Sequence, residues 1–115
     1  MVDLATEAAY EKLGENPVAL DVSKYYSLSD AFLIVSGRNE RQVQSIAEEI
    51  EDQFREAGFK LVLKEGQQLG RWILLDFGDL LIHVMHEQDR MYYSLERLWS
   101  DCPVLKVPAA STATL

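Results

Sequence analysis

Two aspartates, Asp76 and Asp79, stand three positions apart between two apolar runs of the chain. Carboxylates are hard ligands, and a catalytic magnesium ion usually takes one or two of them, so this pair is the first candidate for a metal site. The spacing argues against it, because metal-dependent nucleotidyl transfer typically uses two aspartates two positions apart on one strand face, and no Gly-rich phosphate loop accompanies these. We favour a turn, in which both aspartates bond backbone amides and Gly78 adopts positive φ. We predict no metal site.

The two histidines, His83 and His86, are three positions apart. On a strand this spacing sends them to opposite faces, so they make a poor metal pair. We interpret His83 as a satisfied structural residue, and we expect His86, near the strand end, to be exposed. No nucleophile with a matching base stands nearby. We therefore assign no catalytic residue and expect no cofactor.

The segment 36–39, SGRN, lies between a predicted strand and the start of a predicted helix, where phosphates bind to free backbone amides. Arg38 and Arg41 add positive charge. A single glycine is a weak signal, because the Gly-rich fingerprints of nucleotide sites are absent. The favoured interpretation is a surface turn with two solvated arginines.

Trp72 begins an apolar run directly after Gly70 and Arg71. Tryptophan and arginine are over-represented among the residues that dominate interfaces. A half-buried tryptophan serves core and interface equally well, so spacing alone leaves both open. Trp99, at helical spacing from Leu95, is assigned to the core.

The stretch 71–85, RWILLDFGDLLIHVM, must position these residues. Its two apolar runs flank the four residues 76–79, which predicts a β-hairpin with a tight connection. The second run is mostly apolar on both strand faces, with Leu80, Ile82 and Val84 on one and Leu81, His83 and Met85 on the other. Such a strand belongs in a sheet that is covered on both sides.

The clearest helix follows Asn39, which can cap the first turn, while Gln42 can reach back as in a capping box. Gly58 is placed to end it. One apolar stripe runs along this helix: Val43, Ile46, Ala47, Ile50, Phe54 and Ala57.

Weaker patterns predict the other elements. We expect helices at 3–13 and 89–99, strands at 18–22, 31–36 and 59–64, and a loop at 65–70. At 115 residues the chain supports one compact domain, which we assign to 1–107. The tail 108–115, PAASTATL, offers little to bury and is expected to be disordered.

Charge limits the partners. A net charge of −8, from 19 acidic and 11 basic residues, repels nucleic-acid phosphates and anionic membranes. No apolar run approaches the ~20 residues of a spanning helix, and the N-terminus resembles no targeting peptide, so we expect a cytoplasmic protein. The single cysteine, Cys102, is interpreted as a packing residue.

Several segments together resemble the ribosomal silencing factor family, also called the Iojap family. They are LDVSKYYSLSDAFLIVSGRNERQVQSIAEEI (20–50), EG (65–66), RWILLDFGDLLIHVM (71–85) and RMYYSLERLW (90–99). No single piece is decisive, but their order and spacing are jointly specific. The similarity covers residues 20–103.

The resemblance implies an α/β domain of the α+β type, with a mixed five-stranded sheet flanked by helices. This fold is related to the nucleotidyltransferases but lacks their catalytic carboxylate pattern. It further implies a protein that binds the large ribosomal subunit through a ribosomal protein on the intersubunit face. Occupying that face would block subunit joining and silence translation when nutrients are short. The expected mechanism is steric, so we expect no enzyme.

The resemblance also assigns partner-binding residues on the hairpin. These are Trp72, Leu75, Asp76, Gly78 and Asp79, with Glu65 and Arg71 at the rim. Four helix residues also match the family, and the resemblance does not say whether they pack inside the protein or contact the partner: Arg90, Tyr93, Glu96 and Trp99. One departure is the segment 38–40, where family members often carry small hydroxyl residues.

Two alternatives stay open at this stage. A magnesium-dependent nucleotidyltransferase-like enzyme would use Asp76 and Asp79 on the metal and the turn at Ser36 on phosphate. A self-associating domain would pair its exposed apolar hairpin face with a second copy, giving a homodimer.

Overall fold

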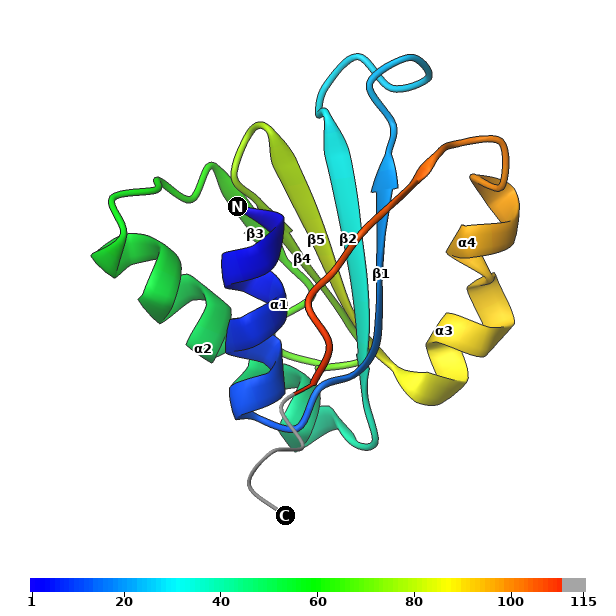
Figure 1. The fold of residues 1–115 in the computed structure, drawn as a ribbon. Helices are drawn as coiled ribbons and strands as arrows, with labels where there is room; N and C mark the ends of the chain where they lie inside the picture. Colours follow the sequence, from blue (N-terminus) through cyan, green and yellow to red (C-terminus); the bar gives the residue numbers. More distant parts are fainter. Residues whose placement is uncertain (111–115) are drawn as a thin grey trace.

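The protein is described from a computed structural model, in which residues 1–110 are placed. A mixed sheet carries two helices on each face (Figure 1). Within those residues the sheet has six strands in the order β3-β4-β5-β2-β1-β6. They are β1 (Glu15–Asp21), β2 (Ala31–Gly37), β3 (Leu63–Glu65), β4 (Trp72–Asp76), β5 (Leu80–His86) and β6 (Val104–Leu105). The expected α+β class is confirmed, with one strand more than the five expected.

Strands β2 and β5 form the centre of the sheet and run parallel, whereas every other neighbouring pair is antiparallel. Nearly every residue of both central strands is buried. This agrees with a strand that is apolar on both faces, because a parallel pair needs cover on each side.

Helix α2 (Glu40–Glu56) supplies much of the cover on one face. Asn39 caps it, its side chain accepting a hydrogen bond from the Gln42 amide at 2.8 Å. The Gln42 side chain accepts from the Arg38 amide at 2.6 Å, one residue before the cap. The predicted apolar stripe is buried from Val43 to Phe54, and helix α1 (Val2–Glu11) packs beside it on the same face (Figure 1).

Helices α3 (Glu87–Tyr93) and α4 (Leu95–Leu98) lie on the opposite face. One continuous helix at 89–99 was expected, and this prediction is wrong. Ser94, with φ 47°, ends α3 and begins α4. The break turns apolar side chains of the expected stripe outward, so Met91, Tyr92 and Leu98 are exposed.

Two strands differ from prediction at the sheet edges. The strand expected at 59–64 is shorter and later, Leu63–Glu65, because the paired ladder with β4 begins only at Leu63, opposite Asp76. The unpredicted β6 pairs with β1 through Leu105 and Val104. Beyond it, the Tyr10 hydroxyl donates to the Pro108 carbonyl at 2.9 Å. Of the tail expected to be disordered, 111–115 lie outside the described residues.

The β4–β5 turn has the predicted chemistry at Asp76 and Gly78, but within the described part of the chain the Asp79 side chain does not accept the backbone hydrogen bond that was expected of it. An Asp76 carboxylate oxygen accepts a hydrogen bond from the Gly78 amide at 2.8 Å, and Gly78 has φ 87°. Cys102 is buried among apolar side chains, which confirms its packing role. None of the helices within residues 1–110 has the length and apolar character that crossing a membrane requires.

Candidate interaction surface

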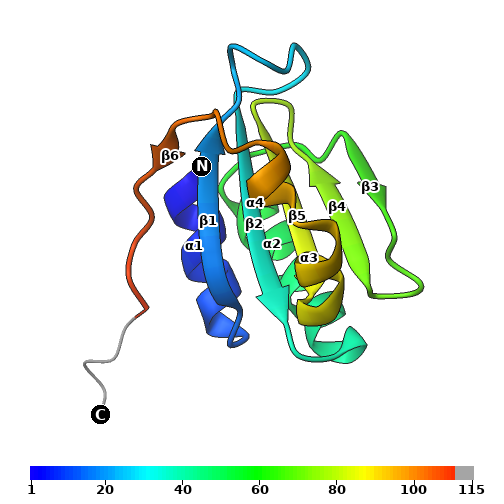
Figure 2. The same ribbon diagram turned by 90° about the vertical axis from the view of Figure 1, so that its right-hand side faces the viewer.

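Strand β4 alternates between buried and half-buried residues. Ile73 and Leu75 have no exposed surface and face α1 and α2. Trp72 and Leu74 pack at the margin of the other core cluster and stay half-buried. In Figure 2, α3 and α4 stand in front of the middle of the sheet, and β3 and most of β4 lie beside them. This part of the sheet face is therefore only partly covered.

Strand β3 extends the same face. Its residues Leu63 and Glu65 pair directly with Asp76 and Leu74, and directly paired residues of antiparallel strands share a face. Leu63 is 48% exposed and Glu65 is exposed. We call this area the Trp72 surface; it comprises Leu63, Glu65, Trp72, Leu74, Asp76 and Tyr93.

Trp72 is held from two sides. Its indole Nε1 donates a hydrogen bond to Nδ1 of His83 at 3.1 Å. Its ring lies against that of Tyr93, with centroids 5.0 Å apart. Burial lowers the pKa of His83 to about 4, so the imidazole is neutral at neutral pH and Nδ1 is free to accept. The tryptophan is thus both anchored and half-exposed, as its sequence context allowed.

Arg71 is tied to the rest of the protein. Its guanidinium pairs with Asp89 at the start of α3 and lies 4.0 Å from a Glu40 carboxylate oxygen. The hydrogen bond that Arg71 donates to the Asp89 carboxylate raises the pKa of Arg71. Glu40 also lies 3.6 Å from His86, which is buried against the expectation of exposure, because it caps α3. Arg71 therefore joins β4 to the helices on both faces.

The expected contact residues fall into two groups. Trp72 pairs with Met85 at one end of the hairpin and Asp76 with Leu81 at the other. Four residues of strand separate the ends by ~13 Å. Asp79 is exposed in the turn, at the far end from Trp72. Trp72 and the turn therefore lie at opposite ends of the hairpin, and of Asp76 and Asp79 only Asp76 shares the face of Trp72.

Leu75 requires a correction. It has no exposed surface and packs in the core that α1 and α2 cover, so it offers nothing to a partner. Its neighbour Leu74 lies on the partly exposed face instead. Strict alternation from Trp72 would have selected Leu74, because side chains two positions apart on a strand share a face.

The four residues of the α3–α4 segment that match the family fall into two groups, those that pack inside the protein and those at its surface. Arg90 is buried, donates to the Ser36 hydroxyl at 2.8 Å and pairs with Glu96 at 3.3 Å. The Trp99 ring packs 5.1 Å from that of Phe32. Tyr93 is 49% exposed. Of the four residues, Tyr93 alone joins the Trp72 surface.

The candidate phosphate loop is occupied by internal contacts. Ser36 is buried and receives the Arg90 hydrogen bond. Arg38 forms an exposed ion pair with Glu15 at 2.9 Å, and this hydrogen bond lowers the pKa of Glu15. The favoured surface turn fits these contacts, with Arg41 exposed and Arg38 paired.

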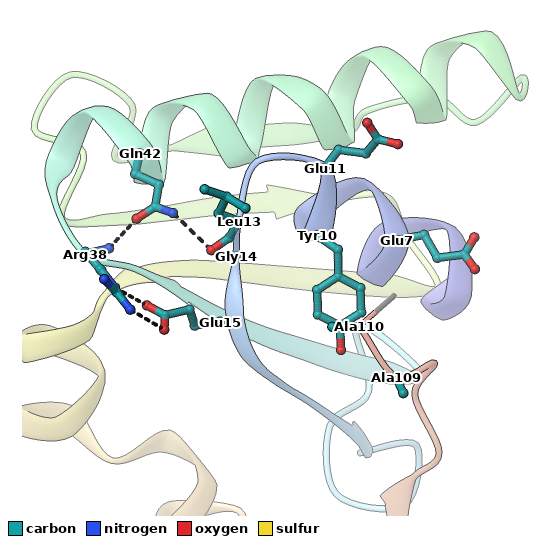
Figure 3. A pocket seen from close by; sticks show the side chains of 10 residues that line it. All are labelled: Glu7, Tyr10, Glu11, Leu13, Gly14, Glu15, Arg38, Gln42, Ala109 and Ala110. Carbon is teal, nitrogen blue, oxygen red and sulfur yellow. Dashed lines mark hydrogen bonds and ion pairs between the residues drawn. The ribbon is translucent and has the colours of Figure 1, made fainter. Parts of the chain in front are cut away.

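A hollow of about 820 Å³ lies at the end of α1, between that helix, the start of α2 and the C-terminal segment (Figure 3). Several of its polar groups are already paired: Arg38 with Glu15, and the Gln42 amide with the carbonyls of Lys12 and Leu13. Its helix lies across the sheet from the Trp72 surface. Within residues 1–110 no three His, Cys, Asp or Glu side chains gather as a metal cluster.

Comparison with known proteins gives a consistent result. A family model described as "Ribosomal silencing factor during starvation" matches residues 1–114. Ribosomal silencing factors of Halalkalibacterium halodurans and Bacillus subtilis are 39% and 41% identical, over 93% and 90% of this chain and 92% and 88% of theirs. A crystal structure of a Chromobacterium violaceum protein is similar with a TM-score of 0.82 and 34% identity, covering 97% of this chain and 93% of that one. The chain belongs to the ribosomal silencing factor family.

Proposed function

We propose that this protein binds a ribosomal protein on the intersubunit face of the large ribosomal subunit and blocks subunit joining by occupying that face. Translation is then repressed when nutrients are limiting. Membership in the silencing factor family supports the ribosomal target. The mechanism is steric and takes place in the cytoplasm.

The observation that carries the proposal is the half-exposed Trp72. Tryptophan dominates interfaces when its ring is presented on a surface that a partner can cover. Here the indole lies against the Tyr93 ring, two strand positions from Leu74, on a sheet face that α3 and α4 cover only in part. Adjoining aromatic and aliphatic side chains that stay accessible in this way support the proposal of an interaction site here.

Charge selects the kind of partner. Glu65 and Asp76 lie on the Trp72 surface, and the whole chain carries a net charge of −8. Such a surface favours a basic protein and opposes direct contact with ribosomal RNA. Many ribosomal proteins are basic because they neutralise RNA, so a ribosomal protein meets both requirements.

Two observations weigh against the enzyme alternative. Asp76 is engaged in its own turn through Gly78, and the Ser36 hydroxyl is engaged by Arg90. Self-association would use the same apolar face as the ribosomal partner. A homodimer would therefore compete with ribosome binding, which light scattering over a concentration series with and without large subunits detects.

The test is co-sedimentation with purified large subunits. Trp72→Ala is expected to lower affinity by ~30-fold, which corresponds to a hot-spot loss of ~2 kcal/mol. Leu13→Ala is the matched control, because Leu13 is 75% exposed at the end of α1 and lies off the Trp72 surface. Circular dichroism and thermal melts establish that each variant folds.

Either of two results contradicts the proposal. If the native protein does not pellet with large subunits at modest salt, ribosome binding is wrong for this protein. If folded Trp72→Ala pellets as well as the native protein, the ribosome contact lies elsewhere than the Trp72 surface.

A further inference from the structure

The hydrogen bond between Trp72 and His83 directs the polar atom of the indole into the protein. The acceptor, His83, sits on the neighbouring strand β5 and is only 6% exposed. Tyr93 supports the Trp72 ring, with an angle of 46° between the ring planes. The indole is therefore fixed in orientation, with its N–H already bonded and part of its ring left accessible.

The protonation state of His83 follows from this bond. An indole N–H donates and never accepts, so Nδ1 must be the unprotonated nitrogen and Nε2 carries the proton. Nε2 is buried, and within residues 1–110 it has no hydrogen-bond partner. The neighbouring ring of Phe32, with its centroid 5.0 Å from that of His83, is apolar.

A histidine is a poor choice for the core at this position. An unpartnered buried donor destabilises the folded state, and an apolar side chain of similar volume would avoid that loss. What histidine provides and an apolar residue cannot is the acceptor for Trp72. The contact with Trp72 therefore explains the residue better than its packing does.

We propose that His83 is a positioning residue for partner binding, which holds the Trp72 indole in one orientation and keeps its N–H away from the partner. This inference rests on the proposed function. A side chain fixed in advance loses less rotamer freedom on binding, which raises affinity. The partner then meets the surface of the ring, which suits an aliphatic group or the stem and cationic head of a lysine or arginine.

Three variants test the proposal. His83→Asn keeps an acceptor oxygen close to the position of Nδ1, and His83→Leu keeps a similar volume without an acceptor. Met85→Leu is the matched control, because Met85 pairs directly with Trp72 in the sheet, is fully buried and makes no such bond. Each variant is measured for large-subunit affinity and, by NMR, for solvent exchange of the Trp72 indole proton.

The indole of Trp99 gives a second NMR signal that serves as an internal reference, and Trp72→Phe assigns the pair. In the native protein, His83→Asn and Met85→Leu, the Trp72 indole proton is expected to exchange slowly. In His83→Leu its exchange is expected to accelerate at least ~10-fold. Affinity for large subunits is expected to fall ~5-fold in His83→Leu and to stay within ~2-fold in the other two variants.

The failures are distinguishable. If native protein binds large subunits and folded His83→Leu binds equally well, or keeps slow indole exchange, the positioning role is wrong while the ribosomal function stands. If the native protein binds no large subunits, the proposed function fails and the role of His83 in binding fails with it.

Discussion

The two faces of the sheet differ in how completely helices cover them. On the face under α1 and α2, Ile73 and Leu75 of strand β4 have no exposed surface. On the face of α3 and α4, Trp72 and Leu74 of the same strand remain half-buried. All four side chains are apolar. Whether a residue serves the core or a surface therefore depends on which helices pack over it, and not on its hydrophobicity.

The difference has a local cause in the helices. Helix α2 runs for 17 residues with one continuous buried stripe. On the other face the helix breaks at Ser94 into pieces of 7 and 4 residues. Two short helices leave the β3–β4 part of the sheet open. Apolar surface left open in this way disfavours the isolated protein in water and favours a complex that covers it.

Two adjacent leucines test this contrast with the largest expected effect. Leu75→Ala removes a fully buried side chain and leaves a cavity, so the free energy of unfolding should fall by ~2–5 kcal/mol. Leu74→Ala removes a half-exposed side chain and should lower stability by less than half as much. Urea denaturation of both variants gives the two values.

For large-subunit binding by the folded fraction of each variant, the order of the two effects should be reversed. Leu74→Ala is expected to weaken binding, and folded Leu75→Ala to bind as the native protein does. Equal losses of stability in the two variants would mean that the faces are equally covered, and the contrast between them would be wrong.

The buried histidine gives the next largest effect. Burial depresses the pKa of His83 from 6.5 to about 4. Between these pH values the imidazole is protonated in the unfolded chain and neutral in the folded protein. The free energy of unfolding therefore keeps its full value above pH 6.5 and decreases as the pH falls towards 4, because protonation of His83 favours the unfolded chain. The corresponding decrease in the free energy of unfolding is ~3 kcal/mol.

Subtracting the pH profile of a variant without His83 from that of the native protein isolates this effect from the other titrating groups. Urea denaturation is measured between pH 4 and 7 for the native protein and for His83→Leu, which has no group to titrate at that position. The native protein should lose ~3 kcal/mol more than the variant over this range. Parallel pH profiles would show that His83 titrates normally and is not shielded from solvent.

Local signals in the sequence predicted the parts of the fold that depend on neighbouring residues. The Asn39 cap, the stripe of α2 and the turn at Gly78 all follow from interactions within a few positions. Strand β6 was missed because its two residues are held by pairing with β1, more than 80 positions away. The break at Ser94 was missed because helical spacing continues across one residue with positive φ.

The sequence suggested only some of the residues that make up the candidate surface, and their role in binding stays a proposal. Trp72 and its acidic neighbours were identified from residue type and family resemblance, but Leu75 was chosen where the fold presents Leu74. Both are leucine, so only the strand period separates them. The contribution of Tyr93 depends on α3 packing beside β4, which no local pattern reports.

A substitution in the hairpin turn is expected to have the smallest effect on large-subunit affinity. It tests whether the interaction surface extends as far as the turn. Asp79 lies in the turn, and its backbone carbonyl, not its side chain, accepts the amides of Asp30 and Ala31 at 3.0 and 3.1 Å. Asp79→Asn therefore removes one charge and should leave the fold intact. For an exposed charge at an interface rim we expect large-subunit affinity to fall ~2-fold at low salt.

Salt dependence separates this charge from the apolar surface. The loss in Asp79→Asn should vanish near 1 M salt, where the screening length is ~3 Å, whereas the loss in Leu74→Ala should persist. Asp3→Asn, an exposed acid on α1, is the matched control for net charge. If both asparagine variants lose the same affinity, the turn contributes only to overall charge. The partner then contacts the Trp72 end of the surface, ~13 Å along the hairpin from Asp76, without reaching Asp79 in the turn.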